Sequence, residues 1–191
     1  MLKAKVDALY QSKRAGRADW ADWLYTHHVF LVADKAEELA RRFGANQELS
    51  AAAGMLHDIA DATMSRFAPD HAEMSAEVAR EFLYECGFTA EEMHVIIDDA
   101  MARHNCRAGI PVTMEGKIVA TADAVVHLCT DYYERTRVAQ AQAGMSQADI
   151  SDWSLKKIER DFNDKILFPE VREDARDAYE RLKGSFSDDA Q

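Results

Sequence analysis

Apolar residues recur at helical spacing along most of the chain, and this pattern predicts its secondary structure. Residues three and four apart lie on one face of a helix. The clearest stripe of this kind comprises Val29, Val32, Ala33, Ala36, Leu39, Ala40 and Phe43. Gly44 follows directly, at a place where glycine commonly ends a helix. The pattern therefore predicts a helix that ends at Gly44.

The same spacing, together with start and stop signals, predicts further helical stretches. The segments 70–73 and 89–92 each have the form of a capping box, in which the first residue caps the helix and an acid three residues later caps back. We expect the tail 184–191 to fray. The expected stretches are 47–59, one that follows Pro69, one that follows Thr89, 116–138, 146–163 and 169–182.

Composition supports an all-α fold in a single domain. The chain has 191 residues with only three prolines and eight glycines, and it is rich in Ala, Leu, Glu, Arg and Met, which lose least in a helix. It contains no internal repeat, no Gly-rich phosphate loop and no change in composition that would mark a linker. A chain of this length can bury the core of one domain. We therefore expect one domain over residues 1–191.

The net charge narrows the range of partners. The chain carries a formal net charge of -11 at pH 7, which repels nucleic acid polymers and anionic membranes, so we expect neither as a partner. A small anionic substrate would need a local cation. The three cysteines are widely spaced with no CxxC pair, and the sequence shows neither a signal peptide nor a long apolar run. We expect a cytoplasmic protein, with a homodimer left open.

Four polar residues stand where the pattern predicts a core. The first lies on the apolar face of the helix that ends at Gly44. Two adjacent residues follow the apolar segment 51–56, and the fourth lies within the apolar segment 117–126. Burying a carboxylate is costly unless a cation or hydrogen-bond donors compensate for it. The four residues are His28, His57, Asp58 and Asp123.

Each of these residues alone has an ordinary alternative. An inward histidine is more often a hydrogen-bonded core residue than a ligand, and an inward aspartate is often part of a salt bridge. Together, on several helices, they form a mixed nitrogen and oxygen pocket suited to Mn, Fe, Co, Zn or Mg, with no thiolate to close a structural zinc site. An open coordination position would imply catalysis.

The order of these residues resembles the H…HD…D pattern of the HD-domain superfamily of metal-dependent phosphohydrolases. The segment 28–33 resembles the family's H-x-x-x-V-A helix, and the segment 55–59 resembles its L-H-D-I segment. The resemblance covers about 25–128. It implies a bundle of about five core helices, with outer helices at about 1–24 and 146–183, and metal ligands at His28, His57, Asp58 and Asp123.

Two more histidines occupy positions that some members of this family use for a second metal ion. The segment 71–76 resembles the family's H-x-x-x-S-A, and His104 ends a helix in the family's I-x-x-x-x-x-x-H spacing. His71 lies in a first helical turn, where the helix dipole disfavours imidazolium and leaves a neutral nitrogen. Each has the alternative of an exposed histidine. The resemblance implies that His71 and His104 bind a second ion, with Asp58 between the two.

Charge bears on whether one or two divalent ions are present. Asp58 and Asp123 would cancel the charge of one ion, whereas two ions would keep a net attraction for phosphate and activate a water for attack on phosphorus. With one ion, a basic residue would have to supply the missing positive charge. The candidates are Arg103, Arg66 and Lys35, each with the alternative of a solvated surface residue.

Asp61 departs from the pattern of the family. Many relatives read HDIGK, whereas this chain places an acid at the position of the lysine. Asp61 lies one turn beyond Asp58 on a similar face, so it could bind metal, bind a metal-bound water or be solvated. We take Asp58, Asp61 and Arg103 as the catalytic candidates, and we infer nothing about the substrate from the missing lysine.

The remaining histidines have simpler interpretations. His27 points about 100 degrees away from His28 around the helix, so we expect it at the surface or behind the ligands rather than among them. His94 lies in the first turn after Thr89 and is expected to be exposed. His127 lies four residues after Asp123 and could share its face, which makes it a candidate to contact that carboxylate.

These expectations converge on a hydrolase that cleaves a phosphate ester with a metal-activated water. The resemblance suggests a nucleotide or a related small phosphorylated compound as the substrate. The alternative is a catalytically silent module that keeps the pocket and senses a nucleotide or a metal. A ferritin-like carboxylate bundle needs two Glu-x-x-His motifs, and only the segment 91–94 supplies one, so we set it aside.

Overall fold

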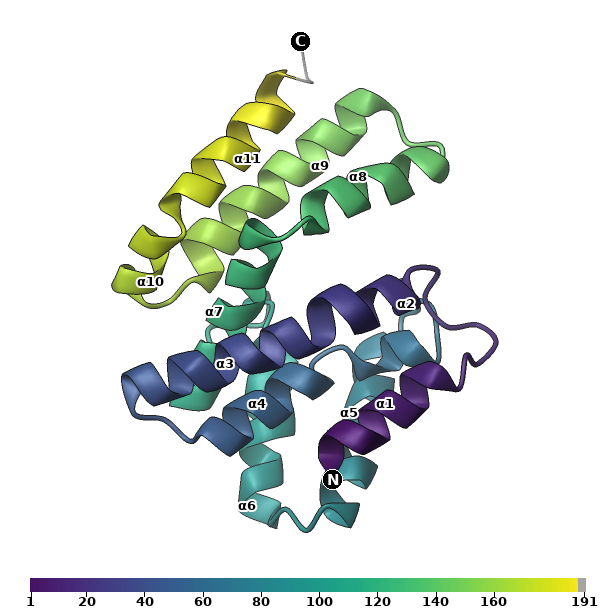
Figure 1. Ribbon diagram of the computed structural model, residues 1–191, viewed down its shortest axis with the longest axis vertical. Helices are drawn as coiled ribbons and strands as arrows, with labels where there is room; N and C mark the ends of the chain where they lie inside the picture. The colour runs from purple at the N-terminus through teal and green to yellow at the C-terminus, as the bar shows by residue number, and fades with distance from the viewer. Residues whose placement is uncertain (189–191) are drawn as a thin grey trace. The chain divides into compact units, whose positions relative to one another are not determined.

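The computed structural model describes residues 1–188, and these residues form helices with no strand among them (Figure 1). The predicted all-α class is confirmed. The chain divides into two compact units, residues 1–122 and the residues from Asp123 onward, and each is described by itself. Within the described part of the chain, no helix has the length and apolar character needed to cross a bilayer. The expectation of a single domain stays a prediction.

The first unit contains the predicted helix that ends at Gly44, and this helix packs mainly against the helix that follows it in the chain. Short π-helical stretches at Tyr25–Val29 and His94–Met101 and a 3-10 turn at Ile59–Ala62 interrupt the α-helices. The α-helices of this unit are α1 (Leu2–Gln11), α2 (Ala21–Leu24), α3 (Phe30–Phe43), α4 (Gln47–Leu56), α5 (His71–Glu85), α6 (Ala90–Met93) and the first part of α7 (Met114–Cys129).

Helices α3 and α4 lie side by side at the centre of the first unit (Figure 1). Gly54 allows the close approach, because a Cβ there would come within 3.0 Å of the Ala33 Cα. Gly44 ends α3 with a φ of 72°, a left-handed conformation that glycine adopts without strain. Asn46 then caps α4 by accepting a hydrogen bond from the Leu49 amide. This short connection holds the two helices against each other.

Helix α4 ends at Leu56, three residues before the predicted end at Ile59. The ring of His57 contacts the Gly54 carbonyl, with 2.8 Å between Nδ1 and the oxygen. In a continued helix that carbonyl would accept from the amide of Asp58. Asp58 instead takes a φ of -131° and starts the 3-10 turn. The pair His57-Asp58 therefore lies in a turn rather than within a helix.

The two predicted capping boxes have different outcomes. At Thr89 both hydrogen bonds of the box are present. At Asp70 no side-chain cap forms, so this prediction was wrong. Asp70 has a φ of -95° and a ψ of 8°, whereas a capping residue needs extended backbone to bring its oxygen to the amides of the first turn.

The second unit holds the remaining helices, and α8, α9 and α11 run beside one another (Figure 1). The predicted helix 116–138 is two helices, because Thr130 and Asp131 interrupt it and the Thr130 hydroxyl donates back to the Val126 carbonyl. The tail is helical to Asp188, so fraying from Gly184 is not seen, and 189–191 lie outside the described residues. The elements are the rest of α7, α8 (Tyr132–Gln142), α9 (Gln147–Arg160), a π-helical turn at Asp161–Lys165, α10 (Pro169–Asp174) and α11 (Arg176–Asp188).

Candidate metal centre

Backbone carbonyls fix the orientation of two histidines in the first unit. His57 Nδ1 lies 2.8 Å from the Gly54 carbonyl, and His104 Nδ1 lies 2.7 Å from the Met101 carbonyl. A carbonyl oxygen only accepts, so in each ring Nδ1 carries the proton. The neutral form of each ring then has its lone pair on Nε2. Both side chains are therefore prepared as metal ligands through Nε2.

These two nitrogens and the Asp58 carboxylate form one compact group. Each residue offers one ligand atom, and the three atoms all lie within 4.8 Å of one another. His104 Nε2 is 3.9 Å from Asp58 Oδ1, and His57 Nε2 is 3.7 Å from Asp58 Oδ2. The His57 side chain is 2% exposed, whereas that of Asp58 is 20% exposed. A mixed nitrogen and oxygen set of this kind fits a divalent first-row metal ion, and solvent reaches it at Asp58.

His28 extends the group on its buried side. It lies in the π-helical turn that precedes α3 and is 2% exposed, which confirms that its side chain points inward. Its Nε2 atom is 3.4 Å from the Nε2 atom of His57. A π-helical turn shifts the following side chains around the helix axis and is frequent at functional sites. His28 is therefore placed to share a cation with His57.

Arg66 lies against the exposed side of Asp58. Its Nη2 atom donates to Asp58 Oδ2 at 2.9 Å. Burial alone would raise the pKa of Asp58, but the charge of Arg66, followed by those of the nearby histidines, holds that pKa well below its ordinary value. Asp58 is therefore held as a carboxylate, as a metal ligand must be.

His71 and Asp61 pair with each other beside this group. His71 Nε2 is 3.0 Å from Asp61 Oδ1, and since a carboxylate only accepts, that nitrogen donates. Burial lowers the pKa of His71, but the hydrogen bond and charge of Asp61 outweigh it, so the pKa is raised. Asp61 is 1% exposed, which excludes the solvated alternative. The structure thus brings His71 to Asp61 rather than into the His57, Asp58 and His104 group.

Two of the basic candidates have partners elsewhere in the first unit. Arg103 Nε lies 3.7 Å from Asp99 Oδ1, and Lys35 donates to Glu38 at 2.6 Å. Asp99 itself accepts hydrogen bonds from Val112 and Thr113, the residues that lead into α7. Of the three basic candidates, Arg66 is the one for which a contact with Asp58 is observed.

Asp123 is the first residue of the second unit and is 2% exposed. Within that unit Lys165 donates to its carboxylate, and His127 Nε2 lies 3.2 Å from Asp123 Oδ1. The contact with His127 agrees with the expectation from their spacing. Lys165 was not a candidate from the sequence. Asp123 therefore has a buried ammonium group as a partner inside its own unit.

A second buried acid continues this network. Asp161 is fully buried and accepts from Lys157 at 2.7 Å and from the Tyr133 hydroxyl at 2.7 Å, while His127 Nδ1 lies 3.0 Å away. Sequence reasoning missed these residues. Positions 157, 161 and 165 are spaced by four and adjoin the apolar stripe of α9, and that spacing is a signal that could have found them.

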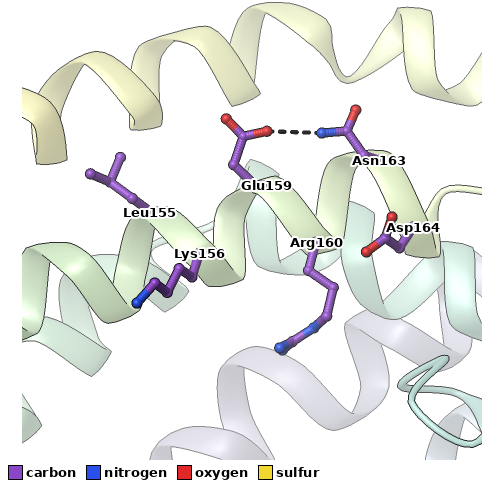
Figure 2. Close-up of a pocket in the computed structure, with 6 residues that line it drawn as sticks. All are labelled: Leu155, Lys156, Glu159, Arg160, Asn163 and Asp164. Carbon is purple, nitrogen blue, oxygen red and sulfur yellow. Dashed lines mark hydrogen bonds between the residues drawn. The ribbon is translucent and has the colours of Figure 1, made fainter.

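The second unit also has a surface depression of about 440 Å³, shown in Figure 2. It is lined by one face of α9 and the following π-helical turn, and Asn163 donates to Glu159 along that face. None of the residues predicted from the sequence as site residues lines it. The lining residues are Leu155, Lys156, Glu159, Arg160, Asn163 and Asp164.

Comparisons with known proteins identify the family and the fold of the chain. A family model described as HD domain matches residues 25–127. The chain is 30% identical over 98 residues to Ribonuclease Y of Campylobacter hominis, and the match spans 51% of this chain but only 17% of that protein. The chain also resembles the crystal structure of an HD-superfamily hydrolase from Bacillus thuringiensis, with a TM-score of 0.64 and 20% sequence identity. The match covers 98% of this chain and 95% of the hydrolase chain. At that identity the likeness shows a shared fold.

Proposed function

The chain belongs to the HD domain family, and on that premise we propose that it is a metal-dependent phosphohydrolase. The observation that carries the proposal is the convergence of the His57 and His104 Nε2 atoms on Asp58, with ligand atoms within 4.8 Å of one another. Both tautomers are set by the backbone, so no rearrangement is needed before a cation binds.

We assign the metal ligands as His57, Asp58 and His104, with His28 beside His57. We propose Asp123 as a further ligand, because it stands at the last position of the H…HD…D pattern, within the residues that the family model matches. A divalent ion bound to these residues would supply Lewis acidity and an activated water for attack on phosphorus. The role of the chain itself is to hold the carboxylates charged and to fix the histidine tautomers.

The proposed substrate is a small phosphorylated compound, with a nucleotide as our first candidate. The net charge of -11 opposes binding of a long polyanion, whereas a small anion can enter at the one-fifth exposed Asp58 beside Arg66. The relative from Campylobacter hominis is by its name a ribonuclease, which supports a phosphate ester that contains a nucleotide. We expect this activity in the cytoplasm.

The test compares the chain with an Asp58→Asn variant, which keeps the size of the side chain and removes its charge. Turnover of nucleotides and phosphodiesters with added Mn²⁺ should fall at least about a hundredfold in the variant, because several kcal/mol of charge stabilisation are lost. Bound Mn²⁺ should fall with it. Asp98→Asn, at an exposed acid of the same unit, is the matched control and should leave both unchanged.

Two results would contradict this proposal. Full turnover by metal-free protein would exclude metal dependence. Saturable nucleotide binding without product over the whole screen would instead favour the silent sensing module.

A further inference from the structure

Arg66 joins two carboxylates of the first unit. Its Nη2 atom donates to Asp58 Oδ2 at 2.9 Å and also to Asp61 Oδ2, and its Nε atom donates to Asp61 Oδ1 at 3.2 Å. The contact with Asp61 is thus a two-pronged one, the geometry that suits a guanidinium and a carboxylate. A single cation from the chain is therefore shared between Asp58 and Asp61.

This arrangement is held firmly rather than formed by a mobile surface arginine. Asp61 is 1% exposed, and its backbone carbonyl accepts from the Ala18 amide at 3.0 Å. His71 also donates to its Oδ1 atom, so both carboxylate oxygens are engaged. The guanidinium lies 5.6 Å from the centre of the Trp20 ring, within the range of a cation–π contact. The positive charge beside Asp58 is a fixed part of the site.

The position of this charge conflicts with a second metal ion. An ion shared between Asp58 and Asp61 would have to occupy the region where the guanidinium binds them both, and two cations at that separation repel strongly. The Nε2 atom of His71 carries a proton that it donates to Asp61, so that atom has no lone pair for a metal. The residues on this side of Asp58 therefore do not fit a second ion.

We propose that Arg66 takes the place of a second metal ion, so that the chain binds one divalent ion and presents Arg66 beside it to the anionic substrate. This proposal rests on the proposed function, because it concerns the same site: one cation is a metal ion and the other is Arg66. Asp61 has the role of positioning Arg66. This assignment replaces the two-ion arrangement implied by the family resemblance.

The test counts Mn²⁺ ions bound per chain by equilibrium dialysis and elemental analysis. The unaltered chain should bind one ion, and Arg66→Lys, which keeps the positive charge, should also bind one. Arg66→Gln removes the charge and releases Asp58 and Asp61, so it should bind two. The second ion of Arg66→Gln would need the Asp61 carboxylate as a ligand. In the double variant Arg66→Gln/Asp61→Asn the number of bound ions should therefore return to one.

Arg80→Gln is the matched control, since Arg80 is an exposed arginine of the same unit paired with Asp98, and it should bind one ion. Circular dichroism confirms that each variant is folded. Two ions in the unaltered chain, or one in folded Arg66→Gln, would overturn the assignment of Arg66 and leave the proposed function standing. Failure of the unaltered chain to bind Mn²⁺ would contradict the proposed function as well.

Discussion

The two units bury charged residues in opposite ways. In the first unit, Asp58, Arg66 and His104 keep between 13% and 21% of their side-chain surface exposed. In the second unit, the side chains of Asp123, Asp161, Lys157 and Lys165 are at most 9% exposed. One cluster can be reached by a ligand, whereas the other is closed.

The two clusters also differ in their balance of positive and negative charges. The closed network sets two carboxylates against two ammonium groups, and the Tyr133 hydroxyl donates to one of the acids. The open cluster sets Asp58 and Asp61 against Arg66, which leaves a net negative charge while its histidines are neutral. An excess of negative charge beside accessible lone pairs suits a cation from solution, whereas a balanced closed network suits a structural role. The comparison predicts that substitutions at Lys157 and His127 act on stability, whereas substitutions in the open cluster around Asp58 act on binding.

The largest effect on stability should come from Lys157→Met. This change removes the ammonium that donates to the fully buried Asp161, and breaking a buried ion pair by removing one partner costs about 3 kcal/mol or more in the free energy of unfolding. The neighbouring Lys156 is 74% exposed and pairs with Asp152, so Lys156→Met should cost less than about 1 kcal/mol. Urea denaturation followed by circular dichroism measures both. Equal losses in the free energy of unfolding for the two lysine variants would mean that the buried network around Asp161 does not stabilise the fold.

Acid should also weaken the second unit, through His127. Burial, the largest cause, lowers the pKa of His127 to about 3, against 6.5 for an ordinary histidine. Between these values the unfolded chain binds more protons than the folded one, so the free energy of unfolding falls as the pH falls from 6.5 towards 3. At pH 5 the loss from this residue should be about 2 kcal/mol relative to pH 7 and above.

The measurement is urea denaturation at pH 7.5 and at pH 5, for the unaltered chain and for His127→Gln. The variant lacks the titrating ring, so its stability should fall less between the two values of pH, by about 2 kcal/mol. Carboxylates that do not contact His127 contribute equally to both proteins and cancel in the difference. Identical pH dependence would show that His127 is not held neutral in the folded state.

The sequence predicted those parts of the fold that depend on short-range patterns. The stripe of α3, its end at Gly44 and the capping box at Thr89 follow from residues within a few positions of one another. The inward orientation of His28 follows from the same periodicity. The capping box at Asp70 failed because the backbone there is not extended, and nothing within those few residues fixes that angle.

The ion pairs were not predictable in the same way. Helical spacing shows which face a residue occupies but not which distant segment lies opposite that face. Lys165 and Asp123 are 42 positions apart, so neither could be assigned to the other from the sequence. Arg66 was one of three basic candidates, of which Arg103 was the one named as catalytic, and the selection of Arg66 required the fold of the turn between Asp58 and α5. The pocket of histidines and acids was therefore foreseeable, whereas its internal cations were not.

The smallest effect on stability, and the sharpest contrast with His127, should come from His104→Gln. The His104 side chain is 13% exposed, and its Nδ1 atom contacts the Met101 carbonyl, so the free energy of unfolding should change by less than about 1 kcal/mol. The same change removes an Nε2 ligand from the group around Asp58 and should weaken Mn²⁺ binding at least about tenfold. Isothermal titration with Mn²⁺ and urea denaturation, applied in parallel to His104→Gln and His127→Gln, separate the two roles. If His104→Gln lost as much stability as His127→Gln and bound Mn²⁺ unchanged, the open cluster would be structural and the contrast between the two units would fail.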